Sequence, residues 1–293
     1  MVMNSLRVLF LVGCLAFAGG NLSYGYMIDG PKILQLVAHK IGRANTLLVN
    51  QHLVTYIFKH KVQRELAKEA VRYDFPNIFR SDMTSDDLNK FFLAKGDRTL
   101  TVVNNQIDPD AESELDLYHF LLLHHHRDGL INFLEMFGID TNIRSLGKFQ
   151  KEIAYVIGAQ YPDDDQSQLW INKVTLLPMR WLLVTLTQPN SMDSDQTSTP
   201  PKLECLEFRF SLWQKFDRLY YPMRLDILHN GILTREIRVN DVIVNPELDN
   251  TMMDIDQQKI LYPKVRQSWI EPDEEDDVDD IQKTIEDFKK KFE

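Results

Sequence analysis

Three consecutive histidines, His124 to His126, are the side chains in this sequence whose type most directly suggests metal binding. On a helix, neighbouring side chains point about 100° apart, so three rings in a row cannot converge on one ion. A helical zinc site instead places its histidines four residues apart. The spacing therefore predicts no metal site at these histidines.

The other side chains with reactive groups give no catalytic pattern either. Asp163 to Asp165 follow a proline, whereas a calcium loop alternates its acids and includes a glycine, so a solvated turn is expected. The sequence has no Gly-x-Ser-x-Gly motif, and Cys205 lies among strand residues as a small hydrophobic side chain. We expect a protein that is not an enzyme and needs no cofactor.

Large apolar side chains are the more informative group. They recur along the strands of the second half of the chain, and they could line a cavity for lipid as readily as they could fill a core. Shielding a ~16-carbon acyl chain from water is worth up to ~13 kcal/mol, at ~0.8 kcal/mol per CH₂, and needs no polar chemistry. The acyl-binding candidates are Trp170, Met179, Trp181, Leu183, Phe208, Phe210, Leu225 and Ile227.

The first 25 residues have the pattern of a secretory signal peptide, with Arg7 followed by an apolar run and small residues. Two processing routes fit. Cleavage after Ala18, or a little later near Gly25, is favoured over acylation of Cys14 in the lipobox-like "LVGC". No later stretch approaches the ~18 apolar residues of a membrane helix. We therefore expect an exported, soluble protein, held at a membrane only if Cys14 is acylated.

The elements that position these side chains can be read along residues 26–262, which we expect to form one domain. "PKILQLVAHKIG", from Pro31 to Gly42, predicts a first helix, and "TLLVNQHLVTYIF" predicts the strand after it. Residues 111–137 have helical spacing, with Gly129 expected to divide them into two helices. The chain from residue 141 onward predicts consecutive strands, joined by a polar mobile loop at 187–202 and by a hairpin at Asn230-Gly231.

The last strand has two unusual features. Its apolar phase changes between Val239 and Val242, which predicts a bulge near Asn240-Asp241. It then meets Asn245-Pro246, and because proline has no N–H for the ladder, we expect the chain to leave the sheet there.

The acidity of the protein is concentrated in a tail at 263–293. Residues 271–293 hold 11 acidic residues and 4 lysines, a net charge of −7 out of −10 for the whole chain. No basic patch suggests a nucleic-acid partner. Within the tail, residues 276–292 predict a short amphipathic helix, because Val278, Ile281, Ile285, Phe288 and Phe292 are spaced by 3, 4, 3 and 4 residues. It is too short to be stable alone, so it must pack on its own domain, a second copy or an envelope protein.

Several segments in order resemble the bacterial outer-membrane lipoprotein-sorting superfamily, the lipoprotein carrier and receptor proteins of the periplasm. They are the opening "GPKILQLVAHKIGRANTLLV", the strand–turn–strand "QLWINKVTLLPMRWLL", the strand "FDRLYYPMRLDIL" and the closing "REIRVNDVIVNPELDNTMMDI". The match covers about residues 30 to 256, and Met252, Met253 and Ile255 stand where that family commonly has an aromatic residue.

The resemblance implies an α+β fold, mainly antiparallel β: an unclosed half-barrel wrapped around helices, LolA-like. It also implies a periplasmic carrier or receptor that binds the acyl chains of lipids or lipoproteins in an apolar concavity, with the helices or loops as a lid. The alternative is an envelope protein-interaction or sensor module built on the same fold.

Overall fold

The computed structural model describes residues 28–58, 62–187 and 202–263. Its strands form one 13-stranded sheet in which every pair of neighbours is antiparallel. The strand order is β6-β5-β4-β3-β2-β1-β13-β12-β11-β10-β9-β8-β7. Among the described residues, the outermost strands β6 and β7 do not pair with each other, so the barrel is open, as the resemblance to the lipoprotein-sorting superfamily implies.

The bounds of the elements follow the chain. The helices are α2 (Gly30–Ile41), η1 (Pro109–Ala111), η2 (Glu114–Asp116), α3 (Tyr118–Leu123), α4 (Arg127–Met136) and α5 (Ile255–Leu261). The strands of the first half are β1 (Thr46–Phe58), β2 (Val62–Asp74), β3 (Ile78–Thr84), β4 (Asn89–Lys95), β5 (Arg98–Val103) and β6 (Gln106–Ile107). Those of the second half are β7 (Arg144–Phe149), β8 (Glu152–Ile157), β9 (Gln168–Asn172), β10 (Pro178–Thr187), β11 (Lys202–Phe216), β12 (Leu219–His229) and β13 (Ile232–Val244).

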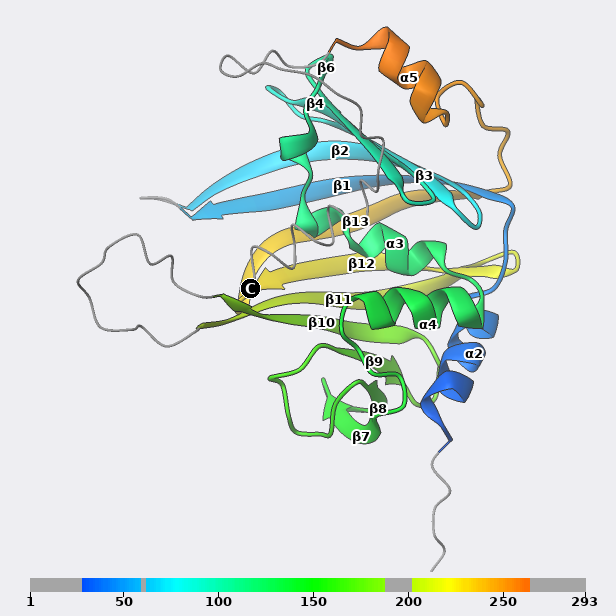
Figure 1. Cartoon of the computed structure of the whole chain (residues 1–293), viewed down its shortest axis with the longest axis vertical. Helices are drawn as coiled ribbons and strands as arrows, with labels where there is room; N and C mark the ends of the chain where they lie inside the picture. Colours follow the sequence, from blue (N-terminus) through cyan, green and yellow to red (C-terminus); the bar gives the residue numbers. More distant parts are fainter. Residues whose placement is uncertain (1–27, 59–61, 188–201, 264–293) are drawn as a thin grey trace, which may run out of the picture.

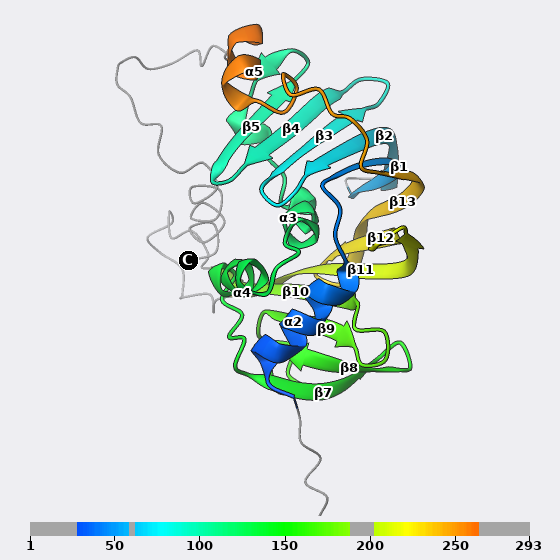
Figure 2. The same cartoon turned by 90° about the vertical axis from the view of Figure 1, so that its right-hand side faces the viewer.

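The sheet curves around α2, α3 and α4, which lie on its concave side (Figures 1 and 2). The apolar face of these helices and the inward side chains of the strands form one large hydrophobic core. On the opposite, convex side, α5 packs on β4 and β5 in a second, smaller cluster. No helix in the described part of the chain is long and apolar enough to cross a membrane.

The first helix forms as its sequence predicts. Asp29 caps it by accepting a hydrogen bond from the Lys32 N–H, and Pro31 occupies the first turn, where no N–H is needed. Gly42 ends the helix with φ +94°, a conformation that glycine adopts at little cost. The predicted stripe is fully buried, so α2 is fixed to the concave face by Ile33, Leu34, Val37 and Ile41.

The division between α3 and α4 differs from the prediction. The chain becomes extended from His124 to His126, and Gly129 lies inside α4. A Cβ at Gly129 would come within 3.3 Å of the His124 ring, so the glycine gives room for that ring to fold back over the helix. The predicted break at Gly129 is therefore wrong, because close packing and not chain flexibility is what the glycine provides.

The end of β13 agrees with the prediction. Asn50 pairs with Asp241 and Gln51 with Val239, so Asn240 is the bulged residue. The strand ends at Val244, and Asn245 adopts φ +54°. Its side-chain oxygen accepts hydrogen bonds from the N–H groups of Asn45 and Thr46, which joins the start of β1 to the end of β13.

The predicted hairpin at Asn230-Gly231 is present, and the strands on either side of the predicted polar loop pair with each other. Asn230 and Gly231 both have positive φ and connect β12 to β13. Thr187 of β10 pairs with Lys202 of β11, and the intervening residues 188–201 lie outside the described part of the chain.

Candidate functional site: an apolar cavity beside the α3–α4 helices

A cavity of about 240 Å³ lies between the two helices α3 and α4 and the β2–β5 half of the sheet. Its walls are mostly aromatic and aliphatic. The lining residues are Pro76, Asn77, Phe92, Gly96, Thr99, Leu117, Phe120, Leu123, His124, Phe133, Met136 and Phe137. Small-molecule sites have this character, with a mainly apolar wall and few polar groups.

Two turns, two strands and two helices bring these residues together. The β2–β3 and β4–β5 turns supply Pro76 and Gly96, the inner faces of β4 and β5 supply Phe92 and Thr99, and most of the remaining wall comes from α3, α4 and the residues that flank them. Met136, at the end of α4, is 39% exposed and so marks where the cavity meets solvent. An apolar chain could enter at this point without passing through the sheet.

The cavity has little charge. Among the described residues that line it, His124 is the only titratable side chain, and its ring lies 5.0 Å from that of Phe133. Burial lowers the pKa of His124 to about 4, so the imidazole is neutral near pH 7. The Thr99 hydroxyl donates to the Glu112 carboxylate at 2.7 Å. The wall therefore favours an uncharged, apolar occupant.

Buried charges hold α3 in place next to this wall. Asp116, just before α3, pairs with Lys90 of β4 at 3.1 Å and with Arg235 of β13 at 2.7 Å. Burial alone would raise the pKa of Asp116, but these two cations outweigh it and hold the pKa well below its usual range. The carboxylate thus links two distant strands to the same end of α3.

A second buried network lies beside α3. The Glu69 carboxylate accepts hydrogen bonds from Gln51 and Ser81, and the Gln51 amide also donates to Tyr118 at 2.8 Å. Burial raises the pKa of Glu69, but His119 and the hydrogen bonds lower it by more than burial raises it, so the carboxyl stays ionised. The sequence analysis missed these polar residues. Gln51 and Leu53 are two positions apart in β1 and both point inward. This alternation along the strand is the feature of the sequence that could have identified Gln51 as a buried polar residue.

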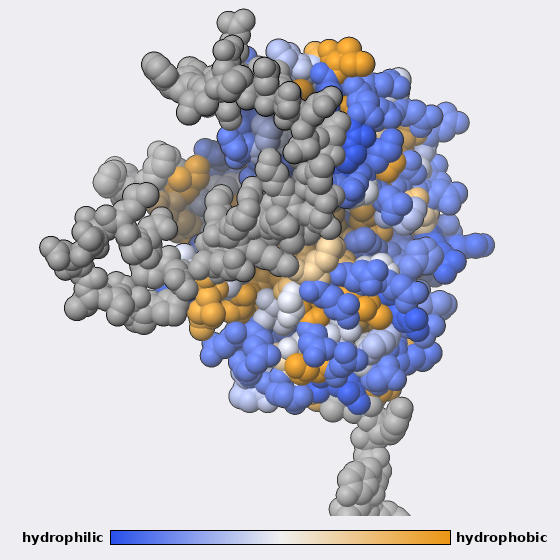
Figure 3. All heavy atoms as spheres, in the orientation of Figure 1, coloured by the Kyte–Doolittle hydropathy of each residue, from blue (hydrophilic) through white to orange (hydrophobic). Residues whose placement is uncertain are grey.

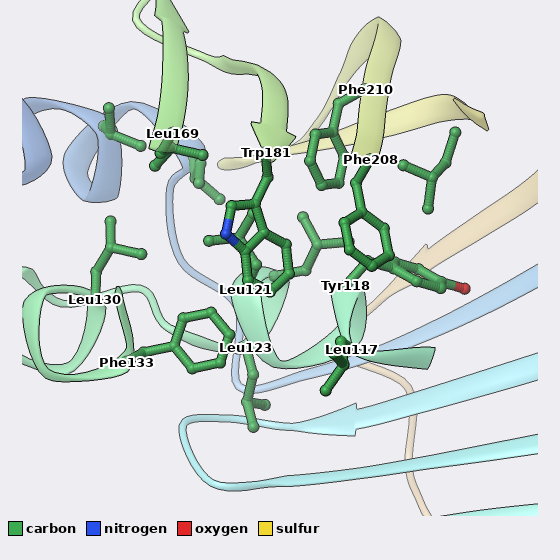
Figure 4. Close-up of a cluster of buried hydrophobic side chains, with 14 of the residues drawn as sticks. Leu117, Tyr118, Leu121, Leu123, Leu130, Phe133, Leu169, Trp181, Phe208 and Phe210 are labelled. Atoms are coloured by element: carbon green, nitrogen blue, oxygen red, sulfur yellow. The ribbon is translucent and has the colours of Figure 1, made fainter. Parts of the chain in front are cut away.

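Six of the eight residues predicted to bind acyl chains lie in the main core on the concave side, but none of them lines the cavity. Trp181 contacts the cavity wall from behind, since its ring lies 5.5 Å from that of Phe133 (Figure 4) and 5.3 Å from that of Phe137, and both of these phenylalanines line the cavity. It is fully buried and forms a second layer behind the cavity wall. The other five are Leu183, Phe208, Phe210, Leu225 and Ile227.

Trp170 and Met179 lie apart from these six. Trp170 packs with Ala154, Val156 and Ala159, and Met179 packs against the same cluster. Trp170 pairs with Arg180, whereas Trp181 pairs with Leu169, so the two tryptophans point to opposite faces of the sheet. The register shift between Pro178 and Arg180 changes the phase of β10, which is why Met179 does not follow Trp181 inward.

The other predicted features are spread over the molecule. His124 lines the cavity, His125 packs on Phe75 with ring centroids 4.1 Å apart, and His126 is exposed. Asp164 pairs with Arg180, and Asp163 accepts a hydrogen bond from the Asp165 N–H. Within the described ranges, no three metal-binding side chains lie close enough to hold an ion. Cys14, the signal segment 1–25 and the 276–292 segment lie outside those ranges.

The described surface carries both polar and apolar side chains. On the face of Figure 3, hydrophobic side chains form separate patches among hydrophilic ones. Two of the most exposed apolar residues, Ile260 at 84% and Leu261 at 66%, belong to α5, which packs on the convex side of the sheet.

Comparison with known proteins identifies the fold. No family model and no curated protein matches the sequence. Among solved structures, an outer membrane lipoprotein-sorting protein domain from Vibrio parahaemolyticus superposes with a TM-score of 0.50 at 8% identity, covering 78% of this chain and 98% of the other. A LolA superfamily protein from Nitrosomonas europaea has a TM-score of 0.49 at 13% identity, covering 78% and 99%. The chain therefore shares its open-barrel fold with the Vibrio parahaemolyticus domain.

Proposed function

We propose that this protein is a non-enzymatic carrier or receptor of the bacterial envelope that binds an acyl chain of a lipid or lipoprotein. The observation that carries the proposal is the apolar cavity beside α3 and α4, on the concave side of an unclosed sheet. An acyl chain needs an apolar wall and no catalytic group, and the wall consists mainly of Phe, Leu and Met side chains.

The size of the cavity indicates how it would be used. Its volume of about 240 Å³ is below the ~300–1,000 Å³ of typical ligand sites. It would hold part of a chain as it stands, and a longer chain would enter as α4 moves away from β4. Helix α4 is attached mainly to α2 and to the β10–β11 half of the sheet through Trp181, so such a movement would leave the β2–β5 half unchanged.

The residues predicted from the sequence have a place in this proposal. Trp181, Leu183, Phe208, Phe210, Leu225 and Ile227 form the apolar floor into which a deeper chain would extend once the helices move. Trp170 and Met179, packed on the convex side, would support β9 and β10 without touching the ligand.

The first test is whether the mature protein holds an acyl chain. Native mass spectrometry of protein purified from an envelope fraction, followed by organic extraction, should show a co-purifying acyl species. A fluorescent fatty acid should then bind the delipidated protein, and Met136→Asp should weaken this binding at least tenfold by placing a charge at the cavity mouth.

Ile260→Asp is the matched control, because it places the same charge at an exposed apolar residue on the other side of the sheet. It should leave fatty-acid binding unchanged. A clean apo mass together with no uptake of the fatty acid, or equal losses in both variants, would reject the acyl-binding proposal.

A second candidate, an envelope protein-interaction or sensor module, is favoured by the exposed apolar residues Ile260 and Leu261 on α5. In that case Ile260→Asp, and not Met136→Asp, would abolish capture of the partner. The same pair of variants thus separates the two functions.

A further inference from the structure

The cavity mouth is an apolar surface in contact with solvent. Met136 is 39% exposed, and Phe120, which also lines the cavity, is half-buried. Opposite them, Pro76 and Gly96 are exposed at the two turns. Such a surface, between a helix and two turns, suits an amphipathic helix with a narrow apolar seam.

The sequence beyond the described residues predicts such a helix. The seam Val278, Ile281, Ile285, Phe288 and Phe292 lies on one side of segment 278–292 when it is helical. A helix of this length is marginal by itself in water, so its apolar seam needs a surface to cover it.

The end of the described chain lies close to the cavity. The Ile107 N–H of β6 donates to the Pro263 carbonyl, and Tyr262 packs on Phe91 of β4. Strands β4 and β5 also carry the cavity residues Phe92 and Thr99 on their other face. The 14 residues from 264 to 277 can span about 45–50 Å when extended, which is long enough to pass around the β6 edge of the sheet.

The charges beside the mouth complement this segment. Asp97 follows the lining residue Gly96, and Glu112 accepts the Thr99 hydroxyl hydrogen bond. Arg98, between them in sequence, pairs with Asp256 of α5 on the outer face. At about 100° per residue, Lys289 and Lys291 flank the apolar seam, whereas Lys290 points away from it. A helix lying in the mouth would bring one flanking lysine to these carboxylates.

We propose that residues 278–292 dock as a helix across the mouth of the cavity in the same molecule, with the Phe288 region facing Met136. The evidence for docking is the apolar seam, the length of the segment 264–277 and the charges beside the cavity mouth. Its consequence, that the tail competes with an acyl chain for the cavity, rests on the proposed function.

Disulfide trapping in the full mature chain tests the docking directly. In a background with Cys14→Ser and Cys205→Ser, Met136→Cys is combined with Phe288→Cys or, as the control, with Lys290→Cys. Under mild oxidation the first pair should form an intramolecular disulfide at least tenfold faster than the control pair, detected by non-reducing electrophoresis and peptide mapping.

Each other result overturns the docking proposal. Covalent dimers would show that the seam covers a second copy, and equal rates for the two pairs would show that the seam does not face the cavity. A preserved far-UV spectrum in both variants excludes unfolding as the cause of a slow reaction.

A binding measurement then tests the competition. If the tail covers the mouth nine-tenths of the time, Phe288→Asp should strengthen fatty-acid binding about tenfold, and Lys290→Asp should leave it unchanged. If the disulfide forms rapidly but no variant binds the fatty acid, the docking proposal is supported and the acyl-binding function is rejected. Fatty-acid binding that Phe288→Asp does not change would reject the competition.

Discussion

Trp181 of β10 stacks on Phe208 of β11 with ring centroids 4.9 Å apart and an angle of 23° between the rings. The opposite side of the indole meets Phe133 and Phe137, which line the cavity on α4. The indole is therefore the layer that connects the β10–β11 half of the sheet to the cavity wall, and it fixes how close α4 lies to the sheet.

Replacing this indole should lower stability and enlarge the cavity. Trp181→Ala removes a fully buried side chain, which typically costs ~3–5 kcal/mol of unfolding free energy. Urea denaturation measures the loss, and a shift in the size of the longest fatty acid bound measures the added space. Trp170→Ala should also destabilise the protein, but it should not change the chain-length preference, because Trp170 lies on the convex side.

Removing the charge that anchors α3 should be strongly destabilising. Asp116→Asn leaves the buried cations Lys90 and Arg235 without their anion, and breaking such a buried group typically costs ~3–5 kcal/mol. The exposed pair formed by Asp128 with Arg127 gives the control, since Asp128→Asn should change stability by less than ~0.5 kcal/mol. Similar losses in the two variants would contradict the anchoring role of Asp116.

Stability should fall as the pH decreases from about 6.5 to about 4. Burial lowers the pKa values of His124 and His125 to about 4, so the folded state binds fewer protons than the unfolded state in this range. The stabilisation is complete above the unfolded pKa of ~6.5 and is lost as the pH falls towards 4, by up to about 3 kcal/mol per histidine at ~1.36 kcal/mol per pKa unit.

His125→Leu should reduce the slope of unfolding free energy against pH, whereas His126→Leu should not, because His126 is exposed. His125 Nε2 lies 2.9 Å from the Leu122 carbonyl and donates to it, which places the acceptor lone pair of the neutral ring on the buried Nδ1. Equal slopes in wild type and His125→Leu would show that other groups cause the acid sensitivity.

The junction between β1 and β13 should depend on Asn245. Its φ of +54° and its side-chain hydrogen bonds to two backbone N–H groups both favour asparagine. Asn245→Ala should lower the unfolding free energy by about 1–2 kcal/mol, as measured by thermal or urea denaturation. Asn245→Gly keeps the backbone conformation and loses only the hydrogen bonds, so it should be less destabilising. A larger loss of unfolding free energy for Asn245→Gly than for Asn245→Ala would contradict this role of Asn245.

The closing strand shows how much of the fold the sequence indicates. The change of apolar phase near Asn240 and the Asn245-Pro246 pair correctly located the bulge and the end of β13, because both depend on the backbone of neighbouring residues. The helices of 111–137 were found, but their division was misplaced, because the room that Gly129 gives to the His124 ring is a packing relation that the local pattern does not contain.

The sequence alone does not locate the candidate site. Trp181 and Trp170 look alike in sequence, yet a register shift in β10 and the pairing of β9 place them on opposite faces. The cavity is lined instead by residues of two turns, two strands and two helices that are up to 61 positions apart, from Pro76 to Phe137.

By itself, the sequence determined the local features: the periodicity that makes strands and helices, the caps and turns that end them, and the recurrence of large apolar side chains along the strands. Only the tertiary structure decided where the empty volume lies, which aromatic residues border it and which buried charges hold the helix beside it. The reason is physical. A cavity is the space left between elements distant in the chain, and a side chain that fills a core and one that borders a cavity obey the same pattern along the sequence.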